Sequence, residues 1–175
     1  MFVDEPIFAK EISDRAENIL SKYAVGKLLV AGDNRYLSDD LLRLIAFIVK
    51  DSLKEKGDDI YRRLEEEFIS GNEIYAPLPH YAENEFYTVL RSPHIARNEE
   101  ALVKPLKKIG SYRKKYLSGL MDVIMVNSVS LLAERLGGAD FDGDMIKTVA
   151  EPKLTSCIMS NYSESDLSLG GNLPL

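Results

Sequence analysis

The sequence has one cysteine among its 175 residues and no long run of apolar residues. Because Cys157 cannot form an intramolecular disulfide, we expect a cytoplasmic protein without a disulfide framework or a redox centre. The segment MFVDEPIFAKEISDRAENIL carries acids where a secretory signal needs a basic region, so it is not read as an export signal. A membrane helix needs roughly 20 successive apolar residues. No membrane partner is therefore expected.

Basic residues are outnumbered, since 22 Lys and Arg stand against 28 Asp and Glu and give a formal net charge of -6. A free-standing, non-specific nucleic-acid binder needs a basic surface, so this class is disfavoured, whereas a local basic patch is compatible with the composition. With 45% hydrophobic and 29% charged residues, the chain has the composition of a globular protein. Its length allows one domain, or a small domain with a helical partner, around a sizeable core.

The first part of the chain has mainly helical patterns, with apolar residues at intervals of three and four and with acidic N-cap candidates. One short apolar run, followed by turn-forming residues, predicts a strand and a turn. The expected elements are a helix over 4–24, a strand over 27–31, a turn at 32–34, a helix over 41–49 that ends by Gly57, and a more solvated helix over 58–69.

After about residue 70, β-branched and aromatic runs replace the helical periods. They predict strands over 85–90, 122–126 and 145–149, and a short helix over 130–136. We therefore expect an α+β chain, with a mainly helical region and one short strand over 1–70 and a β-rich region with short helices over 71–175. Because the closing SLGGNLPL lacks a polar tail, we also expect the chain to be part of something longer.

Three aspartates, Asp140, Asp142 and Asp144, alternate within GGADFDGDMIKTV. Carboxylates this close raise each other's pKa unless a cation lies among them. Hard divalent ions prefer oxygen ligands, and Mg²⁺ is typically held by a few carboxylates together with water and substrate phosphates. Gly143 allows a tight turn through which its neighbours converge on one ion. The cluster thus indicates a metal site for phosphate chemistry.

Two other interpretations of the cluster stay open at this point. Asp142-Gly143 between apolar runs is typical of a polar hairpin turn, which leaves the flanking acids unexplained. The spacing also matches positions 1, 3 and 5 of a calcium-binding EF-hand loop, with Glu151 at position 12. That loop needs glycine at position 6, where this chain has Met145, and it needs a helix to follow, where MIKTV favours a strand.

The string ADFDGD resembles the D-x-D-G-D catalytic loop of the two-barrel RNA polymerases, most closely their single-chain phage and bacterial members. The resemblance implies that the loop projects from a double-psi β-barrel, partial or complete. It also implies that Asp140, Asp142 and Asp144 are the catalytic ligands of Mg²⁺. The function implied is nucleotidyl transfer from nucleoside triphosphates to an RNA 3′ end.

A second match lies upstream, because RSPHIAR at 91–97 resembles the family's R-x-P-x-L-x-R segment. By this resemblance Arg91, and with it Arg97, belongs to the substrate-binding residues. Many relatives have histidine where this chain has Ala96, and His94 receives no catalytic role. A weaker likeness is LLVAGDNRYLSDDLLRLI, at 28–45, which is similar to a strand-turn-helix stretch of single-chain members.

Residues 101–121 contain no acid. The segment carries tyrosines at 112 and 116 and six basic residues, namely Lys104, Lys107, Lys108, Arg113, Lys114 and Lys115. One interpretation is a solvated helix face. The other is a surface that follows a nucleic-acid backbone, with tyrosines stacked on bases, and it assigns Lys107, Lys108, Arg113 and Lys114 to nucleic-acid binding.

The resemblance implies a nucleic acid template, an RNA product and nucleoside triphosphates as partners. The family's second barrel does not fit in the residues after Val149, so the remainder of the polymerase is an expected partner too. We therefore expect an RNA polymerase module that is inactive alone, as a fragment of a larger single-chain enzyme or as one piece of a divided one. The alternative is a non-enzymatic calcium-binding or structural domain.

Overall fold

The computed structural model describes residues 5–27, 30–53, 55–78, 81, 83–93, 99–127 and 129–160. Its contacts divide the chain into two units, Met1–Val30 and Ala31–Leu175. None of the helices in these described ranges combines the length and apolarity that a bilayer span requires.

The first unit contains one helix, α1 (Pro6–Ala24). Pro6 occupies the first turn, where its fixed φ suits a helix and its missing N–H costs nothing. Glu11 and Arg15 form an ion pair of 2.8 Å across one turn. The side chains of α1 are exposed, including an apolar set made of Ile7, Phe8, Ile12, Ile19, Leu20 and Tyr23. The helix predicted over 4–24 is confirmed for its described residues.

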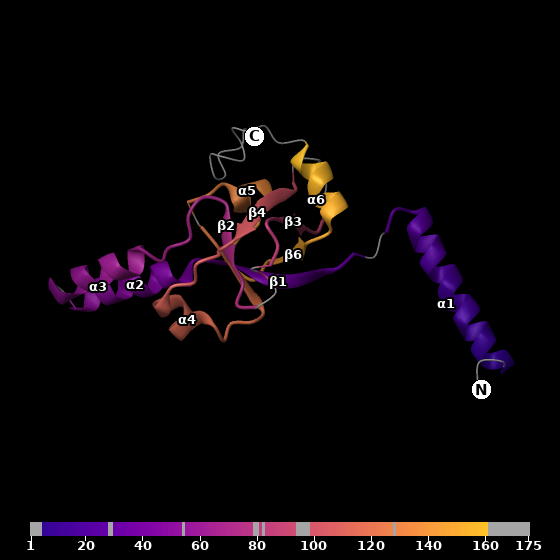
Figure 1. Cartoon of the computed structure of the whole chain (residues 1–175), viewed down its shortest axis with the longest axis horizontal. Coiled ribbons are helices and arrows are strands. Elements are labelled where there is room, and N and C mark those ends of the chain that lie inside the picture. Colours follow the sequence, from indigo (N-terminus) through magenta and orange to yellow (C-terminus); the bar gives the residue numbers. More distant parts are fainter. Residues whose placement is uncertain are drawn as a thin grey trace. The chain divides into compact units, whose positions relative to one another are not determined.

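The second unit is built around a closed barrel of six strands (Figure 1). The strands are β1 (Gly32–Asp39), β2 (Glu73–Tyr75), β3 (Tyr87–Arg91), β4 (Ala101–Pro105), β5 (Val123–Val126) and β6 (Met145–Val149). Around the barrel their order is β1-β5-β2-β4-β3-β6, and β6 pairs with β1 to close it. The pairs β1–β5 and β2–β4 are parallel and the other four are antiparallel. The predicted α+β class is confirmed, and the closed barrel is consistent with a double-psi barrel.

The barrel interior follows from the alternation of side chains along each strand. Ile74 on β2 lies opposite Val126 on β5, and both are buried in the cluster that fills the barrel. Their neighbours Tyr75 and Met125 lie opposite each other and pack on the other face, in a second buried cluster. The two faces of this part of the sheet thus serve two separate cores.

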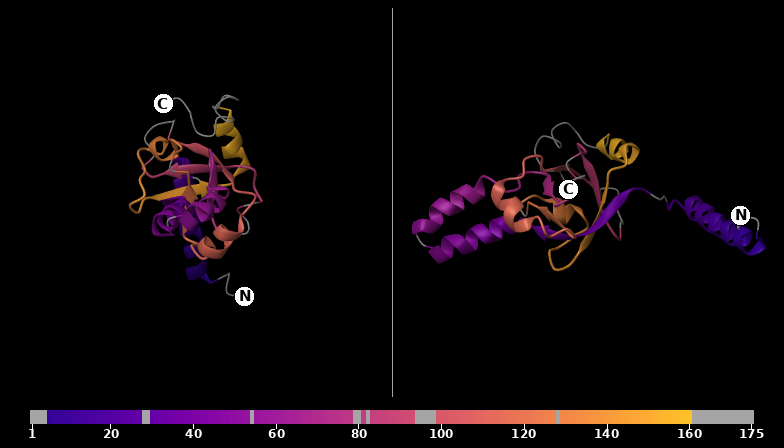
Figure 2. Two further views of the ribbon diagram at one scale, coloured as in Figure 1. Left: turned by 90° about the vertical axis from the view of Figure 1, so that its left-hand side faces the viewer. Right: turned by 60° about the horizontal axis from the view of Figure 1, so that its bottom comes forward.

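Three helices form the second core with β2 and β5: α2 (Leu41–Leu53), α3 (Glu55–Glu65) and α4 (Ser111–Leu117). Leu42, Leu64 and Leu117 contribute one buried side chain from each helix. Helices α2 and α3 lie side by side and extend away from the barrel in the views of Figures 1 and 2. Two short helices complete the unit, α5 (Leu132–Arg135) before the aspartate loop and α6 (Pro152–Met159), which packs against β3 and β4.

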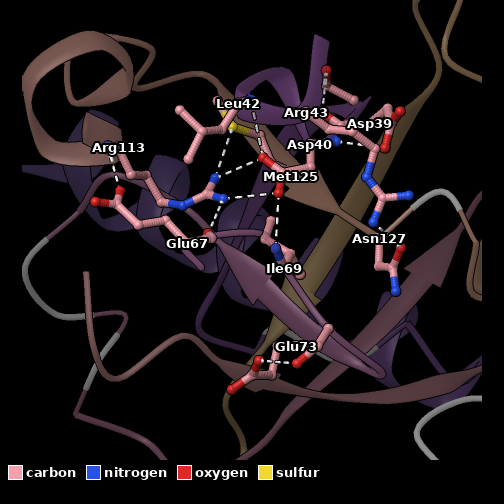
Figure 3. A network of polar contacts seen from close by, with 12 residues as sticks. Asp39, Asp40, Leu42, Arg43, Glu67, Ile69, Glu73, Arg113, Met125 and Asn127 are labelled. Carbon is pink, nitrogen blue, oxygen red and sulfur yellow. Dashed lines mark hydrogen bonds and ion pairs between the residues drawn. The ribbon is translucent and has the colours of Figure 1, made fainter. Parts of the chain in front are cut away.

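A buried polar network joins α2, α4 and the chain after α3 (Figure 3). The Asp40 carboxylate accepts the backbone N–H groups of Leu42 and Ile69 at 3.1 and 2.8 Å. It also receives both terminal nitrogens of Arg113, at 2.9 and 2.8 Å. Glu67 accepts the backbone N–H of Arg113 at 2.9 Å, at the start of α4. Asp40 is therefore both the cap of α2 and the counter-charge of Arg113.

The structure corrects several local predictions. Gly32-Asp33-Asn34 was expected to form a turn, but these residues lie in β1 and pair with 147–149 of β6. A Cβ at Gly32 would overlap with the carbonyl oxygen of Thr148, so glycine is needed there for close approach rather than for a turn. Gly57 does not end a helix, since α3 begins at Glu55. Of the strand expected at 27–31, residues 28 and 29 lie outside the described residues.

Other predicted elements are confirmed within one or two residues. The strands expected at 85–90, 122–126 and 145–149 correspond to β3, β5 and β6, and the helix expected at 130–136 contains α5. The barrel also uses β1, which lies within the region 1–70 that was expected to be mainly helical. The proposed division of the chain at residue 70 stays a prediction.

Candidate metal centre

The aspartate loop connects α5 to β6. Gly137 and Gly138 both have φ of 70°, and the N–H of Gly138 bonds to the carbonyl of Glu134 at 3.2 Å, which ends α5 in the way a glycine C-cap does. Gly143 has φ of 135°, a conformation that side chains with a Cβ rarely adopt. The Asp144 carbonyl then accepts the N–H of Leu37 at 2.8 Å. The end of the loop is thereby fixed to β1.

The three aspartates converge as the sequence pattern predicts. One carboxylate oxygen from each of Asp140, Asp142 and Asp144 lies within 4.8 Å of the others. The backbone N–H of Asp140 donates to Asp144 Oδ2 at 3.1 Å, and that of Asp142 donates to Asp140 Oδ1 at 3.4 Å. The loop thus turns back on itself and holds its carboxylates toward one point.

Electrostatics separate the carboxylates from one another. A side-chain hydrogen bond with Asp140, together with the negative charge of Asp140, raises the pKa of Asp142 above 3.8. The pKa of Asp144 is lowered, first by the backbone N–H of Asp140 and then by its bond to Arg91. Of Asp142 and Asp144, Asp144 is therefore the better stabilised as an anion, because hydrogen bonds favour its charged form. The negative charge of Asp140 disfavours ionisation of Asp142.

Arg91, at the end of β3, contacts the loop directly. Its Nη2 lies 3.2 Å from Asp144 Oδ1 and 3.0 Å from Oδ2, and its Nη1 donates to the carbonyl of Gly137 at 3.3 Å. Fifty-three positions separate Arg91 and Asp144 in the sequence. The antiparallel pairing of β3 with β6, in which Arg91 lies opposite Ile146, brings them together.

An open cleft of about 460 Å³ adjoins this pair. It is lined by Asn34, Leu90, Arg91, Ser92, Asp144, Met145 and Lys147. The residues come from β1, from β3 and the chain after it, and from β6 with the residue before it. Sequence reasoning missed Asn34, Ser92 and Lys147. Lys147 was within reach of a pattern argument, because it is the one charged residue of the predicted strand MIKTV, which begins directly after Asp144.

The carboxylates fit a divalent cation in number, charge and position. An octahedral Mg²⁺ places adjacent ligand oxygens about 3 Å apart and opposite ones about 4.2 Å apart. The three oxygens lie within 4.8 Å of one another, and at most one pair of them can be opposite, so binding of Mg²⁺ would draw the carboxylates closer together. A larger ion such as Ca²⁺ is accommodated with less movement, since its oxygen ligands lie farther out.

An EF-hand arrangement is not formed. The loop is followed by the strand β6 and not by a helix. Five residues of strand span roughly 16 Å and separate Asp144 from the segment that contains Glu151. The Glu151 side chain instead accepts the N–H of Lys153 as the N-cap of α6. The alternative of an EF-hand calcium loop is therefore wrong.

The remaining predicted site residues lie in different places. Arg97, like His94, is outside the described residues. Lys107, Lys108 and Lys114 are exposed, just before and within α4, and Lys107 donates to the carbonyl of Asn84 at 2.7 Å. Arg113 was also expected to bind nucleic acid, but its side chain is 0% exposed and is paired with Asp40. This assignment is corrected, because a guanidinium within the core cannot reach a phosphate.

The tyrosines of the basic segment also differ from each other. Tyr112 packs against the second core, whereas Tyr116 is exposed with the Lys115 amine 5.0 Å from its ring centre. The segment 101–121 is not one solvated helix, since it contains β4 and α4. Its exposed positive charges are therefore lysines next to and within α4.

Comparisons with known proteins give limited matches. No protein-family model matches the chain, and no curated protein matches it. Among solved structures, the chain is similar to the RNA dependent RNA polymerase QDE-1 from Thielavia terrestris, with 16% sequence identity and a TM-score of 0.41. The match covers 96% of this chain and 21% of that chain, so this chain spans about a fifth of the polymerase's length.

Proposed function

We propose that this chain is the catalytic-loop module of an RNA polymerase and that the three aspartates hold a catalytic Mg²⁺. The observation that carries the proposal is the contact of Arg91 with Asp144 and Gly137. RSPHIAR and ADFDGD resemble two separate motifs of the two-barrel RNA polymerases. In this chain the first residue of one segment bonds to the last aspartate of the other, at the end of a barrel strand.

In the proposed site, Asp140, Asp142 and Asp144 would hold the metal, and Arg91 would orient Asp144 while it keeps one guanidinium nitrogen on the loop backbone. The convergence of the carboxylates and the contacts of Arg91 support these roles. When bound, Mg²⁺ would lower the pKa of an RNA 3′-hydroxyl and orient it toward the α-phosphate of a nucleoside triphosphate. The cleft beside Arg91 provides space for the phosphates of such a substrate.

The complete reaction needs groups outside this chain. The family resemblance implies a second barrel that contributes lysines to the active site, and the described residues form one barrel. We therefore propose that the chain acts within a larger polymerase, with a nucleic acid template, an RNA product and nucleoside triphosphates as its partners. The exposed lysines around α4 are proposed to face nucleic acid.

Metal titration tests the proposal on the chain itself. Mg²⁺ and Ca²⁺ are titrated separately into the wild type, into Asp142→Asn and into Asp59→Asn, a control at an exposed aspartate of α3. We expect weak binding of Mg²⁺ to the wild type and to the control, and a loss of at least tenfold in affinity for Asp142→Asn. Tight, calcium-selective binding would favour the non-enzymatic calcium-binding alternative.

Activity requires a polymerase that contains this module. In such an enzyme, Asp142→Asn should reduce RNA extension by at least about 100-fold, the cost of losing a group that stabilises charge in the transition state. Asp59→Asn should leave extension unchanged. An Asp142→Asn enzyme that elongates RNA at the wild-type rate would contradict the assignment.

A further inference from the structure

Lys147 projects from the strand that carries the aspartate loop. Along β6 the buried residues are Ile146, Thr148 and Val149, while Met145 and Lys147 are exposed. Met145 and Lys147 line the same cleft as Asp144 and Arg91. Because a strand rises about 3.3 Å per residue, the Cα atoms of Asp144 and Lys147 are about 10 Å apart along the chain. The lysine is therefore a fixed neighbour of the candidate metal centre.

The strand pairing determines what surrounds Lys147. It lies opposite Asn34 on β1 and opposite Leu90 on β3. Exposed lysines often protect the edge of a sheet from pairing with another chain. Here β6 is hydrogen-bonded on both sides, so this explanation does not apply. The residues beside Lys147 on the neighbouring strands carry no charge.

The charge balance of the cleft leaves Lys147 without a counter-ion. Arg91 and Asp144, which also line the cleft, are bonded to each other. Across the described ranges, no hydrogen bond or ion pair involves the Lys147 amine. An exposed lysine amine is a strongly hydrated point charge that suits phosphate oxygens. The cleft thus contains one cation committed to the loop and one that is available to a ligand.

We propose that Lys147 binds a phosphate group of the substrate in this cleft. The ligand chemistry is an anionic phosphate, supplied either by the backbone of an RNA strand or by a nucleoside triphosphate. The inference rests on the proposed function for the identity of the substrate, but Lys147 binds the phosphate without being a metal ligand. Lys147 is thus an additional substrate-binding residue, and it lies on the outer face of β6.

The test measures phosphate binding by the whole chain with two probes. One probe is a fluorescent single-stranded RNA of about 12 nucleotides, within the usual range of site sizes, and the other is adenosine triphosphate with magnesium chloride. The variants are Lys147→Gln, Lys147→Arg and Lys153→Gln, the last a control at an exposed lysine of α6. Circular dichroism verifies that each variant is folded.

We expect Lys147→Gln to weaken binding about three- to tenfold, as for the loss of one charged contact at an accessible site. If the contact is to an RNA backbone, the slope of log affinity against log salt should also fall by about 0.7. A loss confined to adenosine triphosphate would assign the contact to the nucleotide. Lys147→Arg should retain most of the affinity because it retains the charge, and Lys153→Gln should behave as the wild type.

Equal affinities of Lys147→Gln and Lys153→Gln for both probes would refute the inference, as would a wild type that binds neither probe. These results are independent of the metal titration. Lys147→Gln should keep wild-type affinity for Mg²⁺, so failure at Lys147 leaves the aspartate centre standing. Conversely, retention of Mg²⁺ binding by Asp142→Asn would reject the proposed function whatever the lysine does.

Discussion

Replacement of Arg113 by methionine distinguishes the core role of this arginine from the nucleic-acid role that its sequence context suggests. The side chains of Arg113 and Asp40 are both 0% exposed, and their terminal atoms form two parallel contacts of 2.9 and 2.8 Å. Arg113 Nη2 also donates to the carbonyl of Glu67 at 2.7 Å. Methionine would fill much of the space, but it would leave the Asp40 carboxylate buried without a counter-charge.

The expected loss of stability is large. Removing one partner of a buried ion pair typically costs about 3–5 kcal/mol, because the other charge stays buried and unpaired. Domains are stable by about 5–15 kcal/mol in total, so Arg113→Met should bring this unit near the limit of folding. At about 2–4 °C per kcal/mol for a unit of this size, the melting temperature should fall by about 6 to 20 °C.

Urea denaturation followed by circular dichroism measures this change. The exposed neighbour Lys114→Met is the matched control, and it should change stability by no more than about 0.5 kcal/mol. The double variant Asp40→Asn/Arg113→Met should be more stable than Arg113→Met alone, because the amide carries no charge and its oxygen still accepts a backbone N–H. A loss below about 1 kcal/mol, with weaker RNA binding by an intact fold, would refute the core assignment.

Four further predictions concern the aspartate loop. In metal-free buffer, Asp142→Asn should raise the melting temperature, because it removes a negative charge that Asp140 repels, and Mg²⁺ should then no longer stabilise the chain in a thermal scan. Affinity for Mg²⁺ should fall as the pH decreases through the raised pKa of Asp142, since the protonated carboxyl is not a ligand. Arg91→Gln should let the pKa of Asp144 rise and shift this acid limb to higher pH, as calorimetric titration at several pH values would show. Gly143→Val should cost about 1–3 kcal/mol in thermal stability, because φ of 135° strains a β-branched residue, and an unchanged melting temperature would contradict the argument.

The signs of the two pKa shifts also predict the stability of the metal-free chain. The pKa of Asp142 is raised in the folded state, so its contribution favours folding at low pH and is lost as the pH rises through the folded pKa. The pKa of Asp144 is lowered, so its contribution is present above the ordinary value of 3.8 and is lost as the pH falls through the folded pKa. The two terms oppose each other, and only the first should disappear in Asp142→Asn.

Sequence patterns predicted the elements whose signal is local. MIKTV has a buried-exposed alternation and β-branched residues, and β6 matches the predicted range. The aspartates converge because they share one short loop, so their proximity was readable from spacing alone. By contrast, β2 and β4 were not predicted. EIY has only three residues, and ALVKP has a single β-branched residue and ends in proline, which weakens its strand signal.

The failures share a physical cause, which is pairing between distant segments. Gly32-Asp33-Asn34 has strong local turn preference, yet hydrogen bonds to β6 hold it in a strand. Arg113 lies in a run of exposed lysines, and nothing in that run reveals that Asp40, 73 positions earlier, neutralises it within the core. Local composition describes the average environment of a segment, while a buried charge is determined by one specific partner.

The carboxylates of the aspartate loop differ in how firmly hydrogen bonds fix them. This difference bears on how the loop would bind the proposed cation. Asp144 is fixed by Arg91, by the N–H of Asp140 and by its own carbonyl bond to β1, so its position is set without an ion. Across the described part of the chain, Asp142 is bonded only within the loop, to Asp140, and the charge of Asp140 opposes its ionisation. A divalent ion bound between Asp140 and Asp142 would attract both carboxylates and so offset their mutual repulsion. If the loop holds a divalent ion as proposed, Asp144 would supply a rigid reference point and Asp142 would adjust to the ion.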